Sequence, residues 1–98
     1  MPQLETGFVQ TERWLRLSEA AKAALEGMLQ FAIFRQVEWT IDGTRRQVAE
    51  WLGPETGLGI TTIQGGMAEL ELAGLLRKGR SGAGGPAGFV IAAPLVER

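Results

Sequence analysis

Apolar side chains recur every three or four residues in three stretches of the chain, which is the spacing of helices that bury one face. The first stretch follows Ser18, a residue type that caps helices well, and predicts a long helix over residues 18–35. Alanines and phenylalanines widen its apolar surface around much of the remaining circumference. A helix of this kind is buried on more than one side. Its main stripe consists of Leu25, Met28, Leu29, Ala32 and Ile33.

A second, shorter helix is predicted to begin after Thr44. Gln47 follows three residues later, so the two side chains are placed to form a capping box. Gly53 followed by Pro54 signals the end of this helix, because glycine accepts the left-handed conformation and proline does not continue a helix. The face expected to be buried consists of Val48, Trp51 and Leu52.

The third helix completes a helix pair over residues 44–73. A turn of several residues is predicted from Gly53 to Ile60, after which Thr61 or Thr62 caps the third helix. Gly74 supplies its C-terminal stop. The apolar residues at helical spacing are Ile63, Met67 and Leu70.

Gly65 and Gly66 lie inside this third helix, where each glycine costs about 1 kcal/mol relative to alanine. Two explanations stay open for them. The missing side chains let the helix approach the backbone of a binding partner closely, or the explanation is structural: close packing against the preceding helix, or simply a weak helix.

Alternating apolar residues predict a short strand from Gln36 to Thr40, carried by Val37, Trp39 and Ile41. Residues 1–17 show no helical stripe, so we expect an extended N-terminal arm there.

A strand hairpin is predicted over residues 75–92, with strands at 75–78 and 89–91. The segment between them, Ser81 to Gly88, contains four glycines and a proline and is expected to be a loop.

The sequence runs that form the helix pair and the hairpin carry a resemblance to a known family. They are TRRQVAEWLG at residues 44–53, TTI at 61–63 and AELELAGLLRK at 68–78. This half of the chain resembles the winged helix-turn-helix family of DNA-binding domains. The resemblance implies one α+β domain over residues 1–98, with three helices, a small antiparallel sheet and a glycine-rich wing. It also implies that the strand at 36–40 joins the hairpin as a third strand.

The resemblance places the third helix in the major groove of double-stranded DNA and the wing against the DNA backbone. In this position the missing side chains of Gly65 and Gly66 would let the helix come close to a DNA backbone. Gln64 is then able to read adenine, and threonine methyls to touch thymine methyls. This helix has no arginine for guanine contacts. The implied base contacts are Thr61, Thr62, Gln64, Gly65 and Ala68, and the implied phosphate or wing contacts are Arg45, Arg46, Arg77, Lys78, Arg80 and Ser81.

The net charge of −1 is unusual for a DNA-binding protein, because phosphate neutralisation supplies most non-specific affinity. The charge is unevenly distributed: residues 1–43 carry four basic and six acidic side chains, whereas residues 44–80 carry five and four. The positive balance therefore falls on the segment that resembles a DNA-binding domain.

Several kinds of chemistry are absent from the sequence. The chain contains neither cysteine nor histidine, which excludes disulfides, thiolate catalysis, imidazole metal sites and histidine-dependent triads. The glycine-rich run at 82–85 lacks the Lys-Ser/Thr of a phosphate loop. We therefore expect no enzyme activity, no cofactor and no metal.

No apolar run reaches the roughly 18 residues of a membrane span, and the N-terminus does not resemble a signal peptide. We therefore expect a cytoplasmic protein with no membrane partner.

The apolar surface of the predicted long helix is more than one small domain covers easily, so we expect a homodimer. The alternative is that this helix is simply the central core helix. The expected dimer contacts are Trp14, Phe31 and Phe34, although ordinary packing also explains Trp14.

The sequence favours a small dimeric regulator of transcription or of plasmid or phage replication that binds double-stranded DNA at specific sequences. The order of arm, helix, strand and helix pair is similar to that of the N-terminal domains of plasmid and phage replication initiators. The alternative is a winged helix that serves as a protein–protein interaction module, which the acidic balance and the arginine-free third helix favour.

Overall fold

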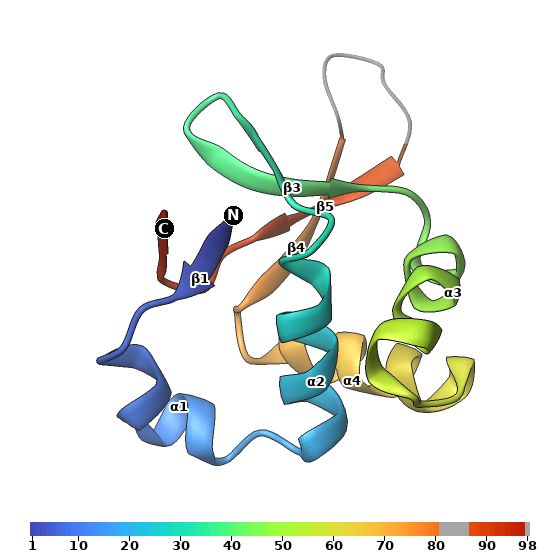
Figure 1. Ribbon diagram of the computed structural model, residues 1–98, viewed down its shortest axis with the longest axis horizontal. Coiled ribbons are helices and arrows are strands. Elements are labelled where there is room, and N and C mark those ends of the chain that lie inside the picture. The colour runs from blue at the N-terminus through green and yellow to red at the C-terminus, as the bar shows by residue number, and fades with distance from the viewer. Residues whose placement is uncertain (81–86, 98) are drawn as a thin grey trace.

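The described part of the chain forms an α+β fold in which four α-helices accompany antiparallel sheets (Figure 1). The computed structural model describes residues 1–80 and 87–97, except for the side chain of Arg80. A short 3-10 helix at Phe8–Gln10 precedes the first α-helix. The four helices are α1 (Glu12–Leu15), α2 (Glu19–Met28), α3 (Arg45–Thr56) and α4 (Ile60–Leu72).

The larger sheet has the strand order β2-β3-β5-β4, and every neighbouring pair is antiparallel. The expected third strand is present, because β3 pairs with β5, and β2 adds a fourth strand beyond it. The loop residues 81–86, and with them Ser81, lie outside the described residues. The strands are β2 (Ile33–Arg35), β3 (Glu38–Asp42), β4 (Leu76–Arg80) and β5 (Ala87–Ile91).

The two ends of the chain meet in a separate two-stranded sheet. Strand β1 (Pro2–Leu4) pairs antiparallel with β6 (Leu95–Glu97), with Pro2 opposite Glu97. The first 17 residues therefore form a strand, a 3-10 turn and α1, whereas we predicted an extended arm. Helical spacing is hard to recognise in elements of three or four residues, so the pattern gave no signal for them.

The hydrophobic core lies between the helices and the inward-facing residues of the large sheet. Trp14 belongs to it, since only 7% of its surface is exposed and its ring packs edge-on against Phe8 at 5.9 Å. Trp14 is therefore a packing residue, which was the alternative explanation, and it is too buried to form the dimer contact that we predicted for it. The fully buried large side chains of the helices are Leu25, Met28, Val48, Leu52, Ile63, Met67 and Leu70.

The predicted long helix over residues 18–35 is wrong in its second half. Helix α2 ends at Met28, and residues 33–35 form β2. A short apolar run fits a buried helix and a strand equally well by period, and pairing with β3 decides between them. A two-residue turn closes the β2–β3 hairpin, with φ of 48° at Gln36 and 59° at Val37. Positive φ at both turn positions matches the twist of paired strands.

The turn between α3 and α4 is shorter than predicted. Helix α3 continues through Pro54 to Thr56 and is capped by Gly57, whose φ is 74°. Proline in the last turn removes only one intrahelical hydrogen bond, so it did not stop the helix. Only residues 57–59 connect the two helices, and α4 begins at Ile60 with Gly59 as its N-cap instead of a threonine.

The capping box at the start of α3 is confirmed. The Gln47 amide donates to the Thr44 hydroxyl at 3.1 Å, and the Thr44 amide donates to the Gln47 side chain at 2.9 Å.

The two glycines inside α4 have different surroundings. A Cβ on Gly66 would lie 2.8 Å from the carbonyl oxygen of Ala20, so this glycine permits a close crossing of α4 over α2. The packing partner is α2, whereas we had named the preceding helix. Gly65 is exposed, and among the described residues no atom outside the neighbouring backbone of α4 lies within 4 Å of where its Cβ would be.

A carboxylate on α4 also fixes the start of α2. Ser18 caps α2 by accepting from the Ala21 amide at 3.1 Å. The Ser18 hydroxyl donates to Glu69 at 2.6 Å and its backbone amide donates at 2.8 Å. These bonds, the hydroxyl's first, hold the pKa of Glu69 below its ordinary value of 4.5. The contact therefore joins α2 and α4 at neutral pH.

Glu69→Gln should reduce stability at neutral pH and make little difference in acid. A carboxyl whose pKa is lower in the folded state stabilises the protein above the unfolded pKa, and this contribution is lost as the pH falls through the folded pKa. The free energy of unfolding of both proteins, measured by urea between pH 7 and pH 3, should converge below the ordinary value of 4.5. Glu55→Gln on the exposed side of α3 is the control. A difference that is the same at every pH would contradict this account.

Candidate nucleic-acid interface

The exposed face of α4 brings the predicted base-contact residues together. Thr61, Gly65 and Ala68 are exposed and follow one another at helical spacing, so they share one face. Thr62 is exposed beside them, and Gln64 is half-buried on the flank. The face carries no charge and has little side-chain bulk, apart from Leu72 at its end, which is 91% exposed.

The N-terminus of α3 is linked to the C-terminal half of α4 by a contact between side chains. Arg45, the first residue of α3, forms an ion pair with Glu71 on α4. Its guanidinium also lies 5.8 Å from the centre of the Phe89 ring. The Nη1 atom of Arg45 is buried and has no hydrogen-bond partner among the described residues.

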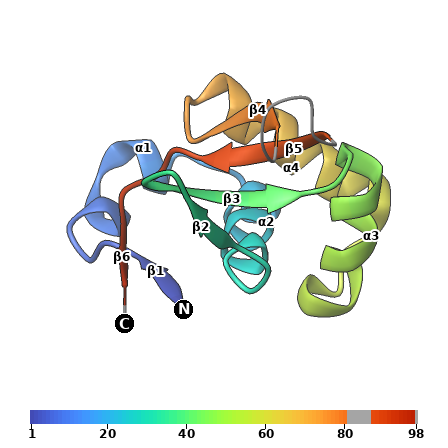
Figure 2. The ribbon, with the colours of Figure 1, turned by 90° about the horizontal axis from the view of Figure 1, so that it is seen from above.

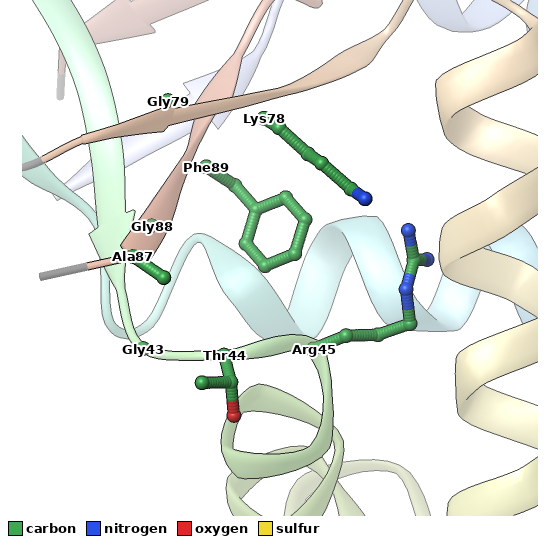
Figure 3. A pocket seen from close by; sticks show the side chains of 8 residues that line it. All are labelled: Gly43, Thr44, Arg45, Lys78, Gly79, Ala87, Gly88 and Phe89. Atoms are coloured by element: carbon green, nitrogen blue, oxygen red, sulfur yellow. The ribbon is translucent and has the colours of Figure 1, made fainter.

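A second cation reaches the same place from the hairpin. Lys78 on β4 lies directly opposite Phe89 on β5, so both side chains point to the helix side of the sheet. Figure 3 shows the Lys78 and Arg45 side chains extending toward each other past the Phe89 ring. They border an open cavity of about 330 Å³. Its lining residues are Gly43, Thr44, Arg45, Lys78, Gly79, Ala87, Gly88 and Phe89.

The other predicted phosphate contacts are engaged elsewhere. Arg46 pairs with Glu50 one turn along α3 at 3.2 Å. Arg77 neighbours Lys78 on β4, so it points to the opposite side of the sheet, where it pairs with Glu38. The backbone of Arg80 pairs with Ala87 at the end of β4. Among the predicted phosphate contacts whose side chains the structure describes, Arg45, Arg46 and Arg77 each form an ion pair. Lys78 forms none with any described residue.

The structure separates the residues predicted for a dimer contact. Phe31 is half-buried and packs on Trp51 with ring centres 6.0 Å apart. Phe34 is 55% exposed on β2 and packs on Trp39. Trp51 was predicted to face the core, yet it is 41% exposed, because the β2–β3 hairpin covers only part of its ring.

Sequence reasoning missed the walls of the cavity. Phe89 was interpreted only as a strand residue, and Glu71, which holds Arg45 beside the cavity, was given no role. Register pairs Phe89 with Lys78, and helix packing brings Glu71 to Arg45. The described residues contain no cluster of three or more acidic side chains that could hold a metal ion. They also contain no helix with the length and apolar character that crossing a membrane requires.

The comparisons with known proteins give one informative match. No protein-family model matches the chain, and no curated protein does. One solved structure that it resembles is described as the N-terminal domain of a DNA-binding protein, with a TM-score of 0.67 and 17% sequence identity. The match covers 98% of this chain and 76% of the other. At this identity the match shows a shared fold.

Proposed function

We propose that this protein binds double-stranded DNA through a winged helix-turn-helix, with α4 in the major groove and the β4–β5 hairpin as the wing. The observation that carries the proposal is the meeting of Lys78 and Arg45 over Phe89, beside the uncharged exposed face of α4. The element order supports it, because a three-residue turn joins α3 to α4 and the hairpin follows directly. Positive charge next to a helix face that is poor in side chains suits a phosphate backbone and a groove.

The phosphate contacts fall to Lys78 and Arg45 in this arrangement. Lys78 has no acidic partner in the described part of the chain, so a phosphate does not have to displace one. Arg45 is paired with Glu71 through one nitrogen and its Nη1 atom is buried without an acceptor, so a phosphate contact there requires the guanidinium to turn outward. Each contact releases condensed counterions from the DNA, which makes the affinity depend on salt.

The base contacts fall to the exposed face of α4. Gln64 has an amide that pairs with adenine, and the methyls of Thr61 and Thr62 pack against thymine methyls. Gly65 and Ala68 let the helix lie deep in the groove. No arginine on α4 is available for guanine, so the expected sites contain A·T pairs at the centre of each contact.

The wider role we propose is a small cytoplasmic regulator of transcription or of plasmid or phage replication, without enzyme activity or cofactor. A two-fold dimer would present two α4 helices to half-sites about one duplex turn apart. The replication context rests on the order of helix, strand and helix pair, without the extended arm, that is similar to the order in replication initiator domains.

A protein–protein interaction module is the second candidate. Two observations favour it: Leu72 is 91% exposed at the end of the α4 face, and Arg46 and Arg77 are engaged in ion pairs. An apolar contact around Leu72 would lose little affinity with salt, in contrast to a phosphate contact.

Lys78→Ala should weaken binding to all DNA sequences and lower the slope of log affinity against log salt by about one unit. The reason is the loss of one phosphate contact that releases one counterion. Fluorescence anisotropy with a fragment selected from genomic DNA, at 50–300 mM salt, measures both quantities. Arg16→Ala is the matched control, because it removes the same charge from an exposed pair with Glu12 on α1.

Gln64→Ala separates sequence readout from backbone binding in the same assay. It should leave the salt slope unchanged and weaken preference at one base pair by about 1–3 kcal/mol. DNA affinity that is unchanged in Lys78→Ala and does not depend on salt would show that the cavity lies outside the DNA interface. That result would favour the protein-interaction module.

A further inference from the structure

The two edges of the four-stranded sheet are built differently. The β4 edge carries Arg77 and Lys78 and ends in Arg80, and charged side chains of this kind discourage pairing with another strand. The β2 edge begins with Ile33 and Phe34, which are 43% and 55% exposed. It has no lysine, proline or bulge, and the only charged residue, Arg35, is held by Asp42 at 2.7 Å. Figure 2 shows β2 at the outer edge of the sheet.

The backbone of β2 presents one pair of hydrogen-bonding groups to the outside. The two-residue turn makes Arg35–Glu38 and Ile33–Thr40 the hydrogen-bonded pairs of the hairpin. Phe34, in between, belongs to the other kind of pair, so its amide and carbonyl point away from β3. No described residue bonds to either group. Because Phe34 is the middle residue of the three-residue strand, its amide and carbonyl would face the carbonyl and amide of Phe34 in an antiparallel copy of the strand.

Apolar side chains surround that pair of groups. Phe34 packs against Trp39 with ring centres 5.1 Å apart, and the two rings border an open cavity of about 330 Å³ beside Glu97. Ile33 points to the other side of the sheet. An antiparallel copy aligned at Phe34 would place Ile33 opposite Arg35 of that copy. Like charges are therefore not opposite each other.

The two-residue turn of the β2–β3 hairpin is strained at Val37. Val37 has a φ of 59°, which is a costly conformation for a β-branched side chain, and it is 86% exposed. Asn-Gly would make the same turn without this cost. An apolar residue kept at the exposed tip enlarges the apolar surface next to Phe34.

We propose that a second copy of this chain docks on β2, so that two β2 strands pair antiparallel about a two-fold axis at Phe34. Each Phe34 amide donates to the carbonyl of the other Phe34, and the two sheets become one continuous sheet. A two-fold contact uses the same patch on both copies, and this edge satisfies that condition. The inference gives a surface to the dimer of the proposed function. It stands independently of DNA binding.

Hydrogen exchange at the Phe34 amide tests this pairing without changing the sequence. The contact is small, so we expect a weak dimer with a dissociation constant of about 10–100 µM. At a total concentration ten times that constant, about four-fifths of the chains are paired, so exchange at Phe34 should slow about fivefold relative to dilute protein. The amides of Ile33 and Arg35 already bond within the hairpin and should change little. Sedimentation over 1–500 µM gives the dissociation constant.

Two lysine substitutions give the matched comparison. Phe34→Lys should abolish the dimer over the whole concentration range, whereas Leu72→Lys should leave it intact, although Leu72 is the more exposed residue. Amide spectra of both variants establish that they are folded. A monomer at 500 µM overturns the proposal, and so does a dimer in which Phe34 exchange is unchanged. A DNA-binding failure with an intact dimer would count against the proposed function alone.

Discussion

Gly66→Ala should lower the free energy of unfolding by about 3 kcal/mol, a large share of the 5–15 kcal/mol typical of a small domain. The added methyl would lie 2.8 Å from the carbonyl oxygen of Ala20 and 3.0 Å from the amide nitrogen of Ala21. Both atoms are backbone, so relief requires α2 to move as a unit. The bonds between Ser18 and Glu69 would be stretched at the same crossing. Thermal unfolding should begin more than 10 °C lower, by roughly 4–8 °C per kcal/mol.

Gly65→Ala is the matched control for this prediction. The same substitution one residue away enters open space on the exposed face of α4. It should raise stability by about 0.5–1 kcal/mol, because alanine is the better helix former and restricts the unfolded chain. If both substitutions had the same effect, the helices would not cross as closely as described. DNA binding by Gly65→Ala also reports whether α4 needs the bare backbone there.

Leu25→Ala should destabilise the protein by about 2–5 kcal/mol without adding any new polar group. Leu25 lies on α2 with none of its surface exposed and belongs to the core cluster between the helices and the sheet. Removing its isobutyl group loses the transfer free energy and leaves a cavity that the helices fill only partly. Urea unfolding followed by circular dichroism measures the change.

Leu72→Ala gives the reference for that experiment. Leu72 ends α4 with 91% of its surface exposed, so truncation should change stability by no more than about 0.5 kcal/mol. A similar loss in both variants would mean that Leu72 is covered, for instance by a partner chain in solution. The pair therefore tests the core and the free α4 face together.

The basic residues show how much of the candidate site the sequence alone predicts. The sequence places five basic side chains in residues 44–80, and each was an equally good candidate for phosphate contact. Two of them are held in ion pairs by acidic residues that are distant in the sequence: Arg45 by Glu71 and Arg77 by Glu38. Ion pairs of that kind depend on helix crossing and strand register. Neither follows from the local pattern.

The sequence by itself determined the elements whose signals are local. The capping box at Thr44 and Gln47, the α4 stop at Gly74 and the alternation that leads into β3 each depend on residues within a few positions of one another. Backbone geometry and hydrogen bonding over one turn are sufficient for these features. The α+β character and the third strand of the sheet were implied by the family resemblance that these elements carry.

The tertiary structure decided what depends on contacts between distant segments. Residues 33–35 became a strand because β3 was available to pair with them, although their period fitted a helix. The meeting of Lys78 and Arg45 over Phe89 required the register of β4 against β5 and the packing of α3 on α4. Strand pairing, register and helix packing each depend on many small contacts between distant segments, and a local sequence pattern does not predict such contacts.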